Sequence, residues 1–137
     1  MKIGFTGTRS GMTPEQREAC ARTLFRLSPD ELHHGDAIGR DSEAHELATN
    51  QDIRVVIHPP VNPSNRAFCE GSEVRAEFPY MLRNRAIVAE TDLLLATPNG
   101  PEASAPRSGT WRTVRYARRM GRRIVIIYPS GDITEAD

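Results

Sequence analysis

Residues 92–129 read DLLLATPNGPEASAPRSGTWRTVRYARRMGRRIVIIYP, and this stretch decides the fold. It begins with one continuous apolar run, Asp92–Thr97, and ends with another, Arg123–Tyr128. An apolar run without alternation is typical of a strand that is covered on both faces. Between the two runs lie a loop rich in Pro, Gly, Ala and Ser and a helical pattern over Gly109–Met120. This order predicts a βαβ unit of a parallel sheet.

The same alternation of strands and helices extends back to the N-terminus. Strands are predicted at Ile3–Thr6, Glu31–His34 and Ile53–His58, and helices from about Pro14 to Leu27, from Asp41 through Ala48, and over Pro79–Glu90. Thr13, Pro14 and Gln16 form a capping-box pattern at the first helix. The polar connection Pro59–Phe78 is longer than a usual βα loop, and such length is typical of lids and binding elements.

These elements predict a Rossmann-like three-layer α/β/α fold with a five-stranded parallel sheet in the order 3-2-1-4-5. Residues 1–129 are expected to form a single nucleotide-binding domain, and residues 130–137 a polar C-terminal tail that frays. In open parallel sheets a ligand binds outside the carboxyl ends of the strands, where the strand order reverses. The predicted crevice therefore opens between the first and the fourth strand.

The overall composition is that of an ordinary globular protein, with 38% hydrophobic and 26% charged residues among 137. A formal net charge of zero argues against gathering nucleic acid by overall charge. Charge is nevertheless uneven, because residues 103–131 contain seven arginines and no acid, whereas residues 30–52 contain seven acids and one arginine. Either one face of the domain is basic, or these arginines complement the dipole and the solvated face of the last helix.

The cysteines, the histidines and the N-terminus set the expected compartment and cofactors. Cys20 and Cys69 match no metal-binding or redox spacing, which favours reduced thiols in a cytoplasmic protein. No histidine pairs with another His, Cys or acid at a spacing that indicates a metal, so neither a metal nor a cofactor is expected. The sequence shows no signal peptide and no membrane span, so no membrane partner is expected.

Two loops that precede helices combine glycines, hydroxyls and an arginine. They are TGTRSG, which contributes Gly7, Thr8, Arg9, Ser10 and Gly11, and RSGT, which contributes Arg107, Ser108, Gly109 and Thr110. Glycine lets backbone amides approach an oxyanion, and a helix N-terminus adds free N–H groups and a favourable dipole. These residues either cap their helices or hold a phosphate, and two such loops at neighbouring strand ends favour the phosphate.

Other polar residues extend this candidate site. The loop GDAIGRD supplies Gly35, Asp36, which can accept from a ribose hydroxyl, and Asp41, which either caps the second helix or faces the ligand. In the third helix Asn84 lies on the otherwise apolar stripe of Tyr80, Ile87 and Val88, so its amide needs a partner in a loop or a ligand. Arg83 lies near the helix start, where a cation opposes the dipole, and this favours a functional role.

Two common nucleotide-binding motifs are absent from the sequence. The first strand is not followed by GxGxxG, and no GxxxxGK[ST] occurs in a chain whose only lysine is Lys2. These absences argue against a hydride-transfer enzyme and against a P-loop phosphotransferase.

Four stretches of the sequence, taken in order, resemble the Rossmann-like nucleotide-binding superfamily called SLOG. They are TGTR, HGDAIGRDSEAHELA, FPYMLRNRAIVAETDLLLAT and RSGTWRTVRYARRMGRRIVIIYP. The pattern RNR, an apolar strand and RSGT is most similar to the branch of DNA processing protein A. In that branch the corresponding residues line a basic pocket for single-stranded DNA, and the resemblance implies this role for Arg83, Asn84, Arg107, Ser108 and Gly109. It also implies a homodimer that pairs through helices.

A more distant resemblance to the Lonely Guy phosphoribohydrolases implies an enzyme. Those proteins use PGGxGTxxE with an arginine on the preceding helix, which Arg83 matches by place, but their catalytic glutamate corresponds to Thr113. An N-glycosidic cleavage therefore needs Asp36, Asp41 or Glu102 as the carboxylate that stabilises the oxocarbenium-like centre or activates water. Three hypotheses remain open: a protein that binds a nucleotide or nucleotide-derived ligand, a nucleotide N-glycosidase or deoxyribosyltransferase, and a single-stranded DNA-binding module.

Overall fold

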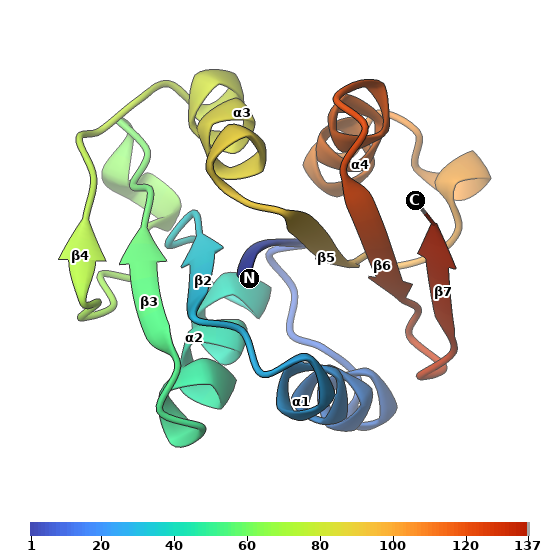
Figure 1. The fold of residues 1–137 in the computed structure, drawn as a ribbon. Helices are drawn as coiled ribbons and strands as arrows, with labels where there is room; N and C mark the ends of the chain where they lie inside the picture. Colours follow the sequence, from blue (N-terminus) through green and yellow to red (C-terminus); the bar gives the residue numbers. More distant parts are fainter. Residues whose placement is uncertain (137) are drawn as a thin grey trace.

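Strands and helices alternate along the chain in the computed structural model, which describes residues 1–136 (Figure 1). The strands are β1 (Lys2–Gly7), β2 (Glu31–His34), β3 (Arg54–Ile57), β4 (Glu73–Val74), β5 (Leu93–Thr97), β6 (Arg123–Ile127) and β7 (Ile133–Ala136). The helices are α1 (Pro14–Leu27), α2 (Arg40–Asn50), α3 (Tyr80–Glu90) and α4 (Gly109–Arg119), with short 3-10 helices η1 (Pro63–Asn65) and η2 (Glu102–Ser104). The helices and strands predicted from the sequence are confirmed to within about two residues at each end.

All the strands belong to one sheet in the order β4-β3-β2-β1-β5-β6-β7. The predicted order 3-2-1-4-5 corresponds to its central part, β3-β2-β1-β5-β6, and these strands are parallel. The prediction of only five strands, all parallel, was wrong, because β4 extends one edge and β7 pairs antiparallel with β6 at the other. Both added strands are short and largely exposed, so they lack the buried apolar pattern that marks a strand. Within the predicted tail, Ile133–Ala136 therefore form an edge strand.

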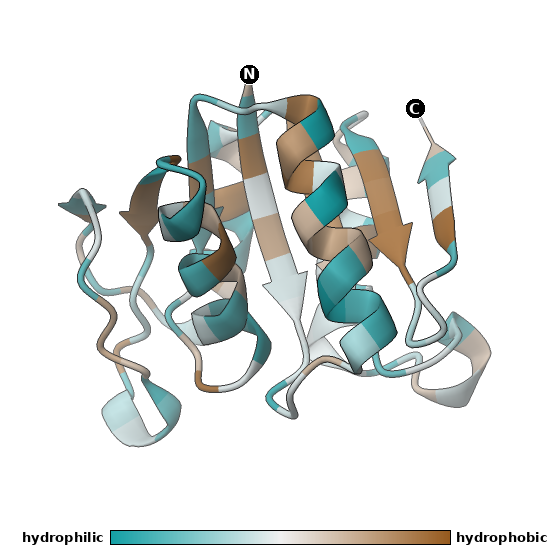
Figure 2. Ribbon diagram, turned by 90° about the horizontal axis from the view of Figure 1, so that it is seen from below, coloured by the Kyte–Doolittle hydropathy of each residue, from teal (hydrophilic) through white to brown (hydrophobic). Residues whose placement is uncertain are grey.

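Helices cover both faces of the sheet, with α1 and α2 on one side and α3 and α4 on the other (Figure 1). Strand β5 shows why: Leu93 and Leu95 pack into the cluster with α1 and α2, whereas Leu94 and Ala96 pack into the cluster with Trp111 of α4. Seen from the side of α1 and α2, the strands carry apolar stretches behind helices that present both hydrophilic and apolar residues (Figure 2). The run without alternation in β5 thus reflects burial on both faces.

Hydrogen bonds connect the start of α1 to the chain at the carboxyl ends of β5 and β6. The Thr13 hydroxyl accepts from the backbone N–H of Gln16 at 3.0 Å, as the capping-box pattern predicts. The Gln16 side chain does not return to the cap, however. It is fully buried and donates to the carbonyls of Pro98 (3.0 Å) and Ile127 (2.7 Å). This side chain therefore joins α1 to the chain at the ends of β5 and β6.

The start of α2 differs from the capping that the sequence suggests. The helix begins at Arg40 after Gly39, and no side chain caps it. Asp41 lies within the first turn, and its Oδ2 accepts from the backbone N–H groups of Gly35 (3.2 Å) and Ala37 (3.1 Å). The interpretation of Asp41 as the cap was wrong, because its carboxylate holds the loop between β2 and α2.

Two features require a glycine at position 39: its positive φ and the close approach of the Arg9 carbonyl. Its φ is +87°, and a Cβ atom there would meet the carbonyl of Arg9. We expect Gly39→Ala to lower the free energy of unfolding by about 3 kcal/mol or more, because a backbone carbonyl cannot move away cheaply. Gly121→Ala is the matched control: its φ is +71°, but no atom lies within 4 Å of the added Cβ. It should cost only about 1–2 kcal/mol in urea unfolding, and equal losses in the two variants would contradict the steric argument.

None of the helices in residues 1–136 is both long enough and apolar enough to cross a bilayer.

Candidate ligand-binding site

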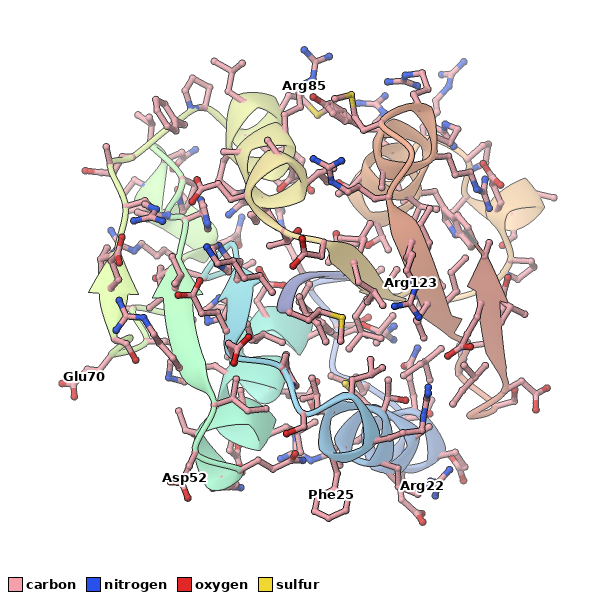
Figure 3. The ribbon with its side chains drawn as sticks, in the orientation of Figure 1. Arg22, Phe25, Asp52, Glu70, Arg85 and Arg123 are labelled. Carbon is pink, nitrogen blue, oxygen red and sulfur yellow. The ribbon has the colours of Figure 1, made fainter. Side chains whose placement is uncertain are left out.

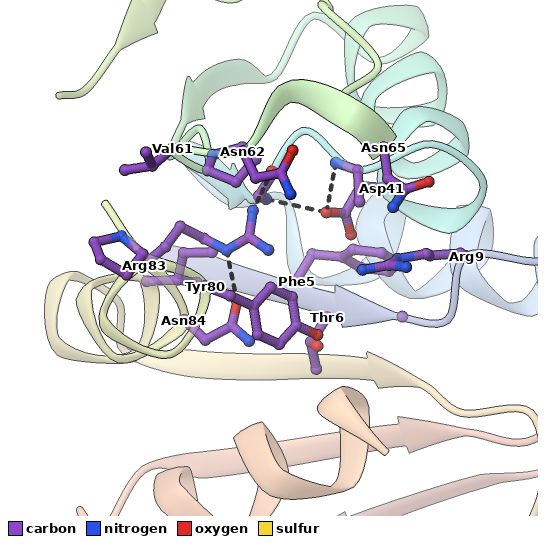
Figure 4. A pocket seen from close by; sticks show the side chains of 16 residues that line it. Phe5, Thr6, Arg9, Asp41, Val61, Asn62, Asn65, Tyr80, Arg83 and Asn84 are labelled. Carbon is purple, nitrogen blue, oxygen red and sulfur yellow. Dashed lines mark hydrogen bonds between the residues drawn. The ribbon is translucent and has the colours of Figure 1, made fainter. Parts of the chain in front are cut away.

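A cavity of about 420 Å³ opens at the carboxyl ends of β1 and β2 (Figure 4). The two strand ends, the start of α3 and the segment between β3 and β4 form its walls. Its lining consists of Phe5, Thr6, Gly7, Arg9, Gly35, Ala37, Asp41, Pro60, Val61, Asn62, Asn65, Pro79, Tyr80, Arg83, Asn84 and Ile87. This volume lies within the range of about 300–1,000 Å³ that small-molecule sites occupy.

Arg83 is the most unusual residue of the cavity, because its charged side chain is only 3% exposed. Its Nε donates to Oδ1 of Asn84 at 2.7 Å, and its Nη1 donates to the carbonyls of Gly35 and His58. Among residues 1–136 no carboxylate lies within ion-pair distance of this guanidinium, and no hydrogen bond occupies Nη2. Buried charges in proteins are normally paired. Burial lowers the pKa of Arg83, although the charges of Asp41, Tyr80 and Asp36 act in the opposite direction.

Arg9 and Arg83 extend toward one another from opposite sides of the cavity (Figure 4). Asp41, the acid in the lining, is 6% exposed, and burial raises its pKa to about 6 although Arg83 acts in the opposite direction. The cavity thus carries two guanidinium groups and one carboxyl group whose ionisation is weakened. This excess of positive charge in the cavity favours an anionic ligand.

The raised pKa of Asp41 predicts how stability depends on pH. Because the folded state holds this proton more tightly than the unfolded state, the contribution of Asp41 to stability falls as pH rises from about 4 to about 6. Asp41→Asn removes the charge and keeps an oxygen that accepts from Gly35 and Ala37. The variant should match the wild type near pH 4 and exceed its stability at pH 7.5, by on the order of 2 kcal/mol. Urea unfolding at both pH values measures this, and a less stable variant at pH 7.5 would show that the carboxylate is favourably held.

The structure brings together six of the residues selected from the sequence. Gly7, Arg9, Gly35, Asp41, Arg83 and Asn84 all line the cavity. Sequence reasoning missed Thr6, Asn62, Asn65 and Tyr80 as lining residues. Asn62 and Asn65 belong to the connection Pro59–Phe78, whose unusual length was the sequence feature that could have indicated them. Tyr80 appears in the sequence as one member of an apolar stripe and as one of three aromatic residues able to stack on a base.

The other selected residues lie outside the lining. The hydroxyls of Thr8 and Ser10 lie 3.2 Å apart and bond to each other. The fully buried Asp36 accepts from Nε of Arg66 (2.8 Å) and from the backbone N–H of Cys69 (2.9 Å), so it anchors the segment between β3 and β4. Glu102 accepts from Arg115 and Arg118 on the far side of α4.

The RSGT loop lies behind Tyr80 and not in the wall of the cavity. Ser108 caps α4, because its hydroxyl accepts from the N–H of Trp111 at 3.1 Å. Thr110 is buried, and Arg107 is exposed. A Cβ atom added at Gly109 would meet the Tyr80 hydroxyl, and Tyr80 itself lines the cavity. One aromatic side chain therefore separates the start of α4 from the cavity.

Arg40 occupies the ends of β1 and β5, where the sequence predicts the crevice. Its Nη1 donates to the carbonyls of Thr97 (2.5 Å) and Pro98 (2.7 Å), and its Nε donates to the carbonyl of Ser10 (3.0 Å). A Cβ atom added at Gly7 would meet both Arg40 and Thr97. The cavity instead opens at β1 and β2, because this fully covered arginine fills the space between β1 and β5.

Comparison with solved structures identifies the fold. The chain matches the molybdenum cofactor binding protein of Rippkaea orientalis with a TM-score of 0.71 and 17% identity, over 93% of this chain and 76% of that protein. It matches the molybdenum cofactor carrier protein of Chlamydomonas reinhardtii with a TM-score of 0.66 and 18% identity, over 91% and 74%. It matches DNA processing protein A of Streptococcus pneumoniae with a TM-score of 0.69 and 17% identity, over 91% of this chain and 49% of that protein. The chain shares the fold of these three proteins.

The expected superfamily resemblance is thereby confirmed at the level of the fold. No protein-family model matches the sequence, and the search of curated proteins found no significant match. The chain spans about half the length of DNA processing protein A. Because one fold supports many functions, the function has to be argued from the cavity.

Proposed function

We propose that the cavity binds a nucleotide or a nucleotide-derived ligand whose anionic group pairs with Arg83 and Arg9. The observation that carries this proposal is the burial of Arg83 without a carboxylate partner among residues 1–136. A phosphate that accepts from Nη2 of Arg83 would neutralise that charge, and guanidinium groups match phosphate oxygens in geometry. Arg9 supplies a second cation from the opposite wall.

The rest of the lining suits the heterocycle and sugar of such a ligand. Phe5, Val61 and Ile87 offer apolar surface, and the exposed ring of Tyr80 can stack on a base. Asn62 and Asn65 supply amide donors and acceptors. A few convergent polar groups within apolar walls are typical of small-molecule sites.

Thermal unfolding with a panel of candidate ligands tests the proposal. The panel contains inorganic phosphate, the nucleoside monophosphates, NAD, ADP-ribose, a single-stranded oligonucleotide and the molybdenum cofactor, which two of the similar structures bind or carry. We expect at least one mononucleotide or dinucleotide to raise the unfolding midpoint, because a ligand that binds only the folded state stabilises it. If no member of the panel raises the midpoint, the proposal is wrong. A shift by the oligonucleotide alone, steeply dependent on salt, would identify a DNA-binding module instead.

The TGTRSG and RSGT loops enter this proposal in different ways. Gly7 and Arg9 already face the cavity, whereas the amides at the start of α4 lie behind Tyr80. A phosphate reaches those amides when the Tyr80 side chain rotates away from Gly109. The ring is 43% exposed, so it can rotate into solvent. Helix N-termini are ready anion sites, so such a movement would give the phosphate a second contact.

The position of Asp41 favours an N-glycosidase as a second candidate function. Asp41 is the one nominated acid that lines the cavity, and its pKa of about 6 suits a group that exchanges a proton near neutral pH. Thr113, which stands where hydrolytic relatives have a glutamate, donates its hydroxyl to the carbonyl of Gly109. Incubation with nucleoside monophosphates should release free base from the wild type and not from Asp41→Asn. Equal release by both would exclude Asp41 as the catalytic acid.

A homodimer in the cytoplasm completes the proposal. The side chains of Met81 and Leu82 on α3 are 37% and 53% exposed, and pairing through helices would cover such apolar surface. Light scattering of the purified protein distinguishes a dimer from a monomer.

A further inference from the structure

A second group of chemically reactive side chains lies outside the cavity, where β2, the end of β3 and the end of α3 meet. His33 and His58 are 1% and 2% exposed, and they approach Glu90, the last residue of α3. One ligand atom from each of these three residues lies within 4.8 Å of the others. The sequence gives no sign of this cluster, because its members are far apart along the chain.

The hydrogen bonds of His33 determine which of its ring nitrogens carries the proton. Nε2 of His33 lies 2.9 Å from Oε1 of Glu31, and Nδ1 of His33 lies 2.8 Å from Nε2 of His58. A carboxylate oxygen accepts hydrogen bonds, so Oε1 of Glu31 accepts from Nε2 of His33. His33 must then carry its proton on Nε2 and present the lone pair of Nδ1 to His58. A carboxylate that orients a histidine in this way is the usual outer partner of a metal-bound imidazole.

One carboxylate oxygen of Glu90 faces the two histidines, and the other accepts hydrogen bonds from Arg75. Its Oε1 accepts from Nε (3.1 Å) and Nη2 (2.7 Å) of Arg75, whereas its Oε2 lies 3.9 Å from Nδ1 of His58. Imidazole nitrogens and carboxylate oxygens are the atoms through which His and Glu bind zinc.

We propose that His33, His58 and Glu90 form a binding site for a divalent transition-metal ion of the zinc class. Two imidazoles and one glutamate match a zinc ligand set that leaves a fourth position for water. The ion takes the place of the proton shared by the two rings, and that proton moves to Nδ1 of His58. Zinc–nitrogen bonds of about 2.0–2.1 Å place two nitrogens about 3.4 Å apart, so the rings separate by about half an ångström. The side chain of Glu90, 36% exposed, gives the ion access from solvent.

A neighbouring cluster, His34, His45 and Cys69, is a poorer candidate. Nδ1 of His34 accepts from the backbone N–H of Asp36 at 2.9 Å, which leaves the ring proton on Nε2, the nitrogen that faces His45. That nitrogen has no lone pair to give to a metal. Burial and the adjacent Asp36 raise the pKa of the Cys69 thiol to about 12, so the thiolate that binds metal is scarce. This cluster serves as the internal control.

Cobalt titration of the full chain without a histidine tag tests the assignment, because Co²⁺ in a zinc site absorbs visible light. We expect the wild type to bind one Co²⁺ per chain with a new visible spectrum, and Zn²⁺ to displace it. Glu90→Gln should weaken binding more than about 100-fold, and Glu31→Gln by about 10–100-fold, as for an outer partner. His45→Gln, the matched control, should bind as the wild type does.

Two results would overturn the assignment. One is the absence of a cobalt spectrum from the wild type, a measurement that does not depend on the folding of any variant. The other is a spectrum that survives in both Glu90→Gln and Glu31→Gln but disappears in His45→Gln. Circular dichroism of each variant establishes that a loss of binding is not a loss of fold.

Discussion

Replacing Arg83 by glutamine is expected to abolish most of the affinity of the cavity for phosphate-bearing ligands. Arg83 is the buried cation of the site, and the groups that hold it are carbonyls and an amide. Removing one partner of a buried, hydrogen-bonded charge pair costs about 2–5 kcal/mol of binding free energy, which is roughly 30-fold to several thousand-fold in Kd. Titration calorimetry with AMP and with inorganic phosphate measures the loss.

Variants of the same helix separate the role of this cation from a general effect of charge. Arg83→Lys keeps the charge but loses the planar guanidinium, so its affinity should fall between those of the wild type and Arg83→Gln. Arg85→Gln removes an exposed arginine two residues away that points out from the domain (Figure 3), and its affinity should stay within about threefold of wild type. Equal losses in Arg83→Gln and Arg85→Gln would refute an anion site at Arg83.

Replacing Arg40 by methionine is expected to cause the largest loss of stability among these variants. The Arg40 side chain is 1% exposed and donates to four carbonyls, those of Ser10, Gly11, Thr97 and Pro98, and to Oδ1 of Asn99. Methionine fills much of the volume but donates no hydrogen bond, so the buried carbonyls of Thr97 and Pro98 lose this donor. We expect the free energy of unfolding to fall by about 3–5 kcal/mol. Urea unfolding measures the change, with the slope against denaturant expected to stay constant.

An exposed arginine provides the control for Arg40. Arg22 on α1 points into solvent (Figure 3), with a side chain 64% exposed that pairs with Glu18 one helical turn away. Arg22→Met should change stability by no more than about 0.5 kcal/mol. A loss below about 1 kcal/mol in Arg40→Met would mean that water replaces the lost donor, and that Arg40 does not join the loops after β1 and β5 as we infer.

The candidate site was predictable where a single residue conflicts with its local pattern. Arg83 opposes the dipole of α3, and Asn84 interrupts an apolar stripe, so both stand out before any contact is known. Both line the cavity. Asp41 shows the limit of this reasoning, because a carboxylate near a helix start predicts a cap equally well. Its choice of Gly35 and Ala37 as donors follows from the path of the loop, which no local rule gives.

The predicted phosphate loops show a second limit. Glycine-rich turns before α1 and α4 indicate free amides, but not which side chains stand in front of them. Arg40 comes from α2 and fills the space between β1 and β5, and Tyr80 comes from α3 and covers Gly109. Each blocking side chain belongs to another element of the fold. The cavity therefore lies at the predicted edge of the sheet, but at β1 and β2 and not at β1 and β5.

The sequence by itself determined the fold class and the extents of the four helices, because hydrophobic periodicity and caps depend on neighbouring residues. The central strand order was predicted from the order common in this fold class. Only the tertiary structure decided which side chains meet. Arg83 bonds to Gly35 across 48 positions, and His33 to His58 across 25. Such pairs depend on how distant elements pack, and no local spacing encodes them. The position of the cavity and the proposed metal site both follow from those long-range contacts.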